Sequence, residues 1–185
     1  MSLERFSLKY KIERLGGIKA LLGRHGIDAY ASILIGIIYL LLVMLKFYNI
    51  SWWKENGPNM TSTLAPIALE IAIISVILKI RRDTISTTAF NKLLEHKGFL
   101  AEIEFYYDFP ITLSILFIII WFLFSAIWLL VSGIDSILKI PTEIILAYLF
   151  VIPLIIFIYG LYNFYYSILA TQIHDGLAII YDKPK

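Results

Sequence analysis

The side chain best placed to do chemistry in this sequence is Glu70, because it is the single ionisable group in a long apolar stretch. That stretch is residues 56–78, which are 23 residues with the carboxyl near the middle. About 20 apolar residues span the hydrocarbon core of a bilayer, and a carboxyl at the centre of a span costs roughly 2.5–3.5 kcal/mol on insertion scales. A carboxyl at that depth is a candidate proton relay or cation ligand.

Further polar side chains are expected at the depth of Glu70. Counted from the charged residue or histidine that ends each apolar stretch, Glu70, Asn163 and Tyr39 all lie 11 residues inside, about 16 Å by helical rise. Three tyrosines near Asn163 share one helix face by their i, i+3, i+7 spacing. The sequence therefore predicts an intramembrane polar cluster of Glu70, Asn163 and Tyr39 with one of the tyrosines Tyr159, Tyr162 and Tyr166.

Two interpretations of Glu70 remain open. No cation of the sequence falls at its depth, so desolvation favours the neutral carboxyl, which can donate one hydrogen bond and accept others. In a structural role it joins helices by a hydrogen bond worth about 0.6–2 kcal/mol. In a functional role it relays a proton or binds a cation. A transporter normally shows more than one such site, which favours the structural or partner-contact role.

Other kinds of chemistry are excluded or unsupported by the residue types. The chain has no cysteine, which excludes disulfides, thiolate nucleophiles, iron–sulfur ligation and zinc-thiolate sites. His25, His96 and His174 lie at the ends of apolar stretches without a spacing such as H-x-x-x-H. We therefore expect solvated histidines, no metal site and no cofactor. Nucleotide-binding, metalloprotease and hydrolase motifs do not occur, so the chain is predicted not to be an enzyme.

The elements that must position Glu70 are long apolar helices. Only 16% of the residues are charged, against about a quarter in soluble domains, and the charges gather between stretches that carry almost none. We predict an all-α integral membrane bundle of four transmembrane helices, formed by residues 29–185. The spans are expected at about 29–46, 61–80, 109–131 and 142–173.

Local signals refine these spans. Gly36 permits a close helix crossing in the first span, and Pro153 is the natural kink in the fourth. Asp108 is a good N-cap for the third span. Residues 99–108 alternate like a strand, but a lone strand has nothing to pair with, so an extension of the third helix is expected instead.

Residues 1–28 are predicted to be a basic amphipathic segment on the membrane surface. Apolar residues recur there at helical spacings beside lysines and arginines, a pattern that binds anionic headgroups; a docking helix for a partner is the alternative. The cytoplasmic connector, residues 83–108, is predicted to hold a short helix that Gly98 ends. The expected membrane-surface contacts are Arg5, Lys9, Lys11, Arg14, Arg81 and Arg82.

The distribution of basic residues predicts the orientation. Of the 16 lysines and arginines, 13 lie in residues 1–28, in residues 79–108 or in the tail, and 3 lie in the other two loops. By the positive-inside rule, both termini and the long connector are cytoplasmic, in a multi-pass protein of the cell membrane. The basic surface is explained by lipid headgroups and does not indicate nucleic-acid binding.

A small bundle with few intramembrane polar groups seldom encloses a substrate path alone. We therefore expect a non-catalytic integral membrane subunit or scaffold, which contacts the lipid bilayer and packs against other membrane subunits or itself through Glu70 and the tyrosine face. The alternative is a homo-oligomeric channel or small transporter that uses Glu70 as a proton or cation site.

Overall fold

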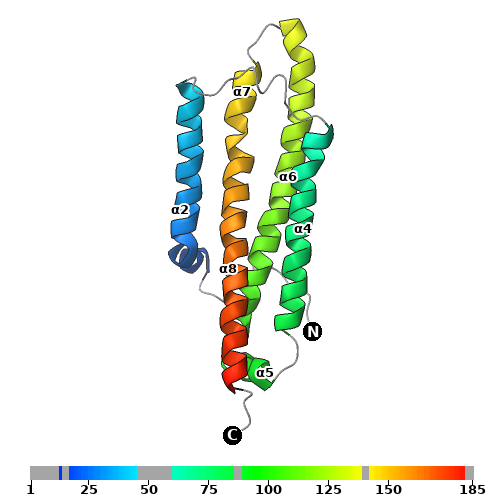
Figure 1. Ribbon diagram of the computed structural model, residues 1–185. Helices are drawn as coiled ribbons and strands as arrows, with labels where there is room; N and C mark the ends of the chain where they lie inside the picture. The colour runs from blue at the N-terminus through cyan, green and yellow to red at the C-terminus, as the bar shows by residue number, and fades with distance from the viewer. Residues whose placement is uncertain (1–12, 14–16, 46–59, 86–88, 139–141, 182–185) are drawn as a thin grey trace.

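The computed structural model describes residues 13, 17–45, 60–85, 89–138 and 142–181, and every regular element in these residues is a helix. The all-α prediction is therefore confirmed for them. Figure 1 shows long helices that run side by side, with a short helix at one end. In chain order they are α2 (Gly17–Met44), α4 (Met60–Thr84), α5 (Ala89–His96), α6 (Leu100–Leu138), α7 (Thr142–Leu149) and α8 (Val151–Tyr181).

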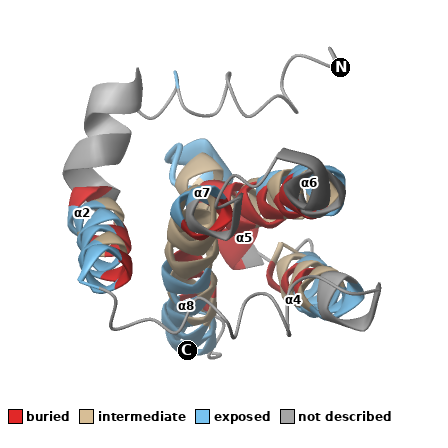
Figure 2. Cartoon of the chain, turned by 90° about the horizontal axis from the view of Figure 1, so that it is seen from above, coloured by how far each residue is buried: buried red, intermediate tan, exposed pale blue. Residues whose placement is uncertain are grey.

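Helix α8 is the central element of this arrangement. It packs against α2, α4 and α6, and α4 also packs along α6. Seen along the bundle in Figure 2, α2 lies on one side of α8, and α4 and α6 lie on the other. The side chains of α8 therefore form most of the contacts between the first span and the rest of the described structure.

Among the described residues, three helical segments are long and apolar enough to cross a membrane: Gly26–Met44, Leu100–Val131 and Ile145–Tyr181. They indicate a multi-pass membrane protein. Helix α4, which contains the second predicted span, is not among these three segments; it carries Arg81 and Arg82 in its last turn. A crossing by α4, and with it the four-span bundle, stays a prediction.

The basic segment predicted at the N-terminus falls largely outside the described residues, and so do its headgroup contacts Arg5, Lys9, Lys11 and Arg14. From Gly17 onward one continuous helix, α2, passes through Asp28 into the first predicted span. The structure therefore has no break at residue 28, where the sequence places the boundary between surface segment and span.

One end of the bundle is filled with aromatic side chains, and we call it the aromatic end. Phe117, Trp121, Phe124 and Trp128 are buried on α6, because their spacing of three and four residues brings them to one helix face. The Phe117 and Trp121 rings stack with centroids 5.9 Å apart, and Phe150 meets Trp121 edge to face at 6.0 Å. We call the opposite end, where α5 lies, the charged end.

Gly98 ends α5 as predicted. Its φ of 78° lies in the left-handed region, which favours glycine because it has no Cβ. Gly98 N–H donates to Glu95 O at 3.0 Å and Phe99 N–H donates to Leu94 O at 2.9 Å, the hydrogen bonds of a Schellman motif. This motif turns the chain directly from α5 into α6.

The start of α6 confirms one prediction and corrects another. Residues 100–108 are helical, so they extend the third span as expected. Asp108 is consequently inside a helix and is not an N-cap; its carboxylate instead lies 3.2 Å from Arg81 Nε of α4. The N-cap signal was misleading because a charged partner on another helix also explains an aspartate at this position.

The break between α7 and α8 lies next to Pro153, as predicted for the kink. Helix α7 ends at Leu149 and α8 begins at Val151. Pro153 has no N–H to donate to the carbonyl of Leu149, so the helical hydrogen-bond ladder is interrupted at this turn. Leu154 N–H still donates to Phe150 O at 3.2 Å, so the two helices follow each other closely.

The close crossing predicted at Gly36 is confirmed. A Cβ on Gly36 would lie 2.6 Å from Cδ1 and Cγ1 of Ile155 and 3.1 Å from Cγ2 of Val151. The absence of a side chain therefore lets α2 approach α8 closely, and backbone proximity of this kind stabilises helix pairs in membranes.

We expect a Gly36→Leu substitution to destabilise the protein by about 1–3 kcal/mol, the usual cost of overpacking a well-packed contact. The apparent melting temperature in detergent micelles measures this loss. Gly176→Leu on α8 is the matched control, because a Cβ there meets nothing within 4 Å. An equal effect of the two substitutions would contradict a tight α2–α8 crossing.

Candidate functional site

Glu70 lies between α4 and α6. Its side chain is 3% exposed and hydrogen-bonds Ser114 of α6, which is also buried. Ile77, two turns further along α4, is fully buried on the same face, so this face of α4 packs inward over its whole middle. The carboxyl is therefore used inside the chain and is not presented on the outer surface of the bundle.

Asn163 is buried but does not join Glu70. Its amide Nδ2 donates to the carbonyl oxygen of Tyr159, one turn back on α8, at 2.8 Å. The Tyr159 ring meets the edge of Phe109 on α6, with centroids 5.9 Å apart. Asn163 also hydrogen-bonds the Tyr159 side chain, so these two members of the predicted cluster meet within α8, whereas Glu70 bonds Ser114.

Tyr39 lies elsewhere, so its place in the predicted cluster is wrong. Its hydroxyl donates to the carbonyl oxygen of Ala147 on α7 at 3.0 Å, and its ring lies 5.6 Å from that of Phe150. The prediction counted the depth of Tyr39 from Asp28 and that of Asn163 from His174. Asp28 and His174 are at different heights, because α8 continues well past the start of the first span.

The contact between Tyr166 and Asp28 shows which level of α8 lies beside the start of the first span. The Tyr166 hydroxyl donates to Asp28 Oδ1 at 3.3 Å, and Asp28 is buried on α2. Tyr162, although on the predicted tyrosine face, is partly exposed. The three tyrosines of that face therefore have three different environments: Tyr159 packs on α6, Tyr166 bonds α2, and Tyr162 faces outward.

The ion pair between Arg81 and Asp108 lies near the same height. Tyr107 bonds Thr171, and Leu113 lies beside Gly160, so Asp108 falls within about one helical turn of Tyr166 along the bundle. We call the level of Asp28, Arg81 and Asp108 the charged level. Arg81 is thus engaged by α6, whereas Arg82 is exposed, as a headgroup contact would require.

Beyond the charged level, hydrogen bonds between side chains join α6 to α8. Tyr107 is fully buried, and its hydroxyl lies 2.7 Å from Thr171 Oγ1. Thr171 donates its own proton to the carbonyl oxygen of Ser167 at 2.8 Å, so Tyr107 is the donor to Thr171. This chain of two hydrogen bonds satisfies buried hydroxyls that would otherwise destabilise the contact.

A second network joins α5 to α8. Asn91 Nδ2 donates to Thr84 O at 2.8 Å, and Asn91 Oδ1 lies 2.7 Å from His174 Nε2. Because Oδ1 can only accept, His174 Nε2–H is the donor. Its other ring nitrogen, Nδ1, lies 3.1 Å from Asp175 Oδ1. His174 is 5% exposed, so the expectation of a solvated histidine is wrong for this residue.

A groove that Leu69, the chain neighbour of Glu70, helps to line has an almost entirely apolar lining. It lies between α4, α6 and α8 toward the aromatic end, has a volume of about 450 Å³, and is lined by residues such as Pro66, Leu69, Trp121 and Phe157. No polar path through the described residues therefore leads from Glu70 to that end by way of this groove.

The geometry supports packing more than reaction chemistry. Among the described residues, no group of three histidine, aspartate or glutamate side chains is arranged to hold a metal ion. Most of the polar groups identified above take part in hydrogen bonds or ion pairs that join two helices. Comparison of the chain with protein-family models, curated proteins and solved structures finds no match.

We expect a double-mutant cycle of Glu70→Ala and Ser114→Ala to give a coupling energy of about 0.6–1.7 kcal/mol, the range for hydrogen bonds between membrane helices. Unfolding in mixed micelles measures it. Ser125→Ala is the control partner for Glu70, because this buried serine is about 16 Å from Ser114 along α6 and should act additively. Zero coupling for Glu70 and Ser114 would contradict the pairing.

Asn91→Ala should loosen α5. Loss of the amide leaves His174 Nε2–H and the Thr84 carbonyl without this partner, at a cost of about 1–3 kcal/mol, equivalent to about 5- to 150-fold faster amide exchange. Hydrogen–deuterium exchange of α5 measures the effect. Lys92→Ala, which removes an exposed side chain of the same helix, should leave exchange unchanged; similar exchange in both variants would refute the network.

Proposed function

We propose that this protein is a non-catalytic subunit or scaffold of a larger membrane complex. It would lie in the cell membrane with four spans and both termini in the cytoplasm, and it would pack against other membrane proteins. The observation that carries the proposal is that α6 and α8 continue far past the charged level, where α5 is attached to them.

Helix lengths support a projection out of the bilayer. The apolar segment of α2, Gly26–Met44, has 19 residues, about 28 Å of helix, which matches a hydrocarbon core of about 30 Å. Tyr166 of α8 bonds Asp28 near the start of this segment. About 15 further residues of α8, up to Tyr181, therefore project about 22 Å beyond that level.

The headgroup layer cannot accommodate all of this projection. On each side of the core it is only about 5–7 Å thick. The last turns of α8, the first turns of α6 and all of α5 would then stand in the cytoplasm, if the positive-inside orientation holds. A membrane protein that builds a helical platform of this kind has a surface for assembly with other proteins.

The satisfied polar groups support a non-catalytic role. Glu70 bonds Ser114, and His174 bonds Asn91, so both side chains take part in contacts within the chain. A homo-oligomeric channel lined by Glu70 has less support, because this residue is buried between two helices of its own chain.

Native mass spectrometry of the protein, extracted gently from its own membrane, tests the proposal. We expect other membrane subunits at fixed stoichiometry. Recovery of the chain alone, or only of copies of itself, would overturn the scaffold proposal. The channel alternative is then tested by proton and potassium flux into liposomes, where Glu70→Gln would have to abolish a flux that the original protein shows.

A further inference from the structure

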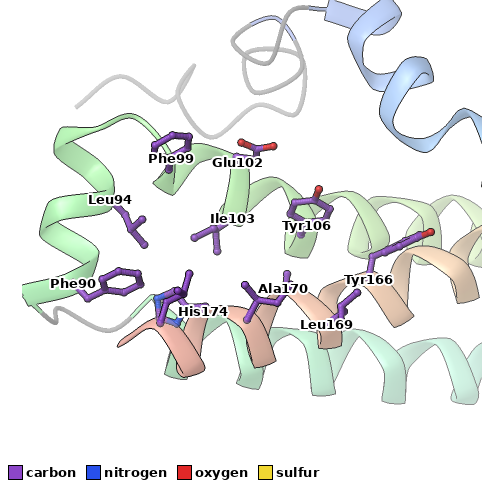
Figure 3. A pocket seen from close by; sticks show the side chains of 12 residues that line it. Phe90, Leu94, Phe99, Glu102, Ile103, Tyr106, Tyr166, Leu169, Ala170 and His174 are labelled. Atoms are coloured by element: carbon purple, nitrogen blue, oxygen red, sulfur yellow. The ribbon is translucent and has the colours of Figure 1, made fainter. Parts of the chain in front are cut away.

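An apolar pocket lies on the far side of the charged level, between α5, the start of α6 and the end of α8. Its volume is about 420 Å³, within the range of binding pockets. Figure 3 shows Phe90, Leu94 and Ile103 around the pocket, with Glu102 at its margin. Glu102 and His174 are the ionisable side chains other than tyrosines among the residues that line it.

An exposed apolar stripe on α8 continues from this pocket to the end of the helix. Leu169, Ile173, Leu177 and Ile180 are spaced by three and four residues, so they share one helix face. They are 36%, 57%, 50% and 71% exposed. Contiguous apolar surface of this kind, where water would otherwise contact it, marks a protein or membrane contact.

In the membrane position proposed above, lipid does not cover the distal part of the stripe. Leu177 and Ile180 lie 11 and 14 residues past Tyr166, about 16 and 21 Å by helical rise. The headgroup layer ends about 5–7 Å past the hydrocarbon core. With Asp28 and Tyr166 near the edge of that core, these side chains are too far out for a lipid contact, so a protein contact remains.

The same face of α8 is already covered by a helix within the bundle. Two residues that contact α2 lie on the same face of α8 as Ile173 and Leu177. They are Ile155, which meets Gly36, and Tyr166, which bonds Asp28. In Figure 1 α2 stops well short of the end of α8, so the last turns of this face lie beyond α2. The exposed stripe is therefore the continuation of a helix-binding face.

We propose that this stripe and pocket bind an amphipathic helix of another membrane subunit, with apolar residues at i, i+3 or i+4, and i+7 and with lysine or arginine beside them. The inference rests on the proposed function and specifies its contact. The helical shape follows from the face that α2 uses. The basic flank follows from the carboxylate of Glu102 at the margin of the pocket, because opposite charges across an interface set register and specificity.

Site-specific photo-crosslinking in the native membrane tests this proposal. A benzophenone amino acid replaces Leu177, and in the control it replaces Ile179, which is exposed on the other side of α8. We expect Leu177 to cross-link to a segment of another chain, whose sequence, read by tandem mass spectrometry, has the basic amphipathic pattern. Cross-links only to lipid, to this chain's own residues 1–16, to a second copy, or to a segment without that pattern would overturn it.

Substitutions measure the contact quantitatively. Leu177→Gln with Ile180→Gln should lower the partner recovered per copy of this chain about tenfold, as loss of an interface hot spot does. Ile179→Gln is the matched control and should leave recovery unchanged. Glu102→Lys should also lower recovery, and unchanged recovery would overturn the basic flank. Native mass spectrometry could find partners that do not cross-link at position 177 and whose recovery these substitutions do not change. In that case the docking surface is wrong and the subunit role stands.

Discussion

The packing of α8 against α2, α4 and α6 is the contact on which the rest of the described structure depends. Within a bilayer, lipid chains are as apolar as leucine side chains, so helices associate through close packing and hydrogen bonds and not through the hydrophobic effect. Gly36 provides the close approach to α2, and the buried Asn163 and Ser167 lie on the inward face of α8. Removal of α8 would leave α2 without its main neighbour.

The polar residues inside the bundle also hold helices together. Glu70 with Ser114, Tyr39 with the Ala147 carbonyl, and Tyr107 with Thr171 each join two helices at a different height. A relay would need neighbouring groups within hydrogen-bond distance of one another. These pairs belong to different contacts between helices, and the aromatic end is filled by stacked rings. Their distribution is that of contacts which fix the register of helices against each other.

The sequence predicted the helices and their local signals better than the contacts between them. Apolar length, Gly98, Gly36 and Pro153 act within one helix or at one crossing, so they can be recognised from nearby residues. Tyr39 was misplaced because its depth depends on the relative height of α2 and α8, which spacing within one segment does not encode. Asp108 and His174 were misplaced because their partners, Arg81 and Asn91, lie on other helices. Asn91 carried a usable signal, since it is an amide next to Phe90 in the connector helix and buried amides need a partner.

The difference in length between α2 and α8 explains why the two ends of the bundle are built differently. At the aromatic end the buried contacts of α6 are mostly between rings. At the charged end α6 and α8 pass the level of Asp28, and the contacts there combine apolar packing with buried hydrogen bonds from Tyr107, Asn91 and His174. Buried polar pairs of this kind hold a projecting element in one arrangement, because any shift leaves a donor or acceptor unpaired. In the proposed membrane position the apolar face of this projection meets water, and an exposed face of that kind marks a contact surface.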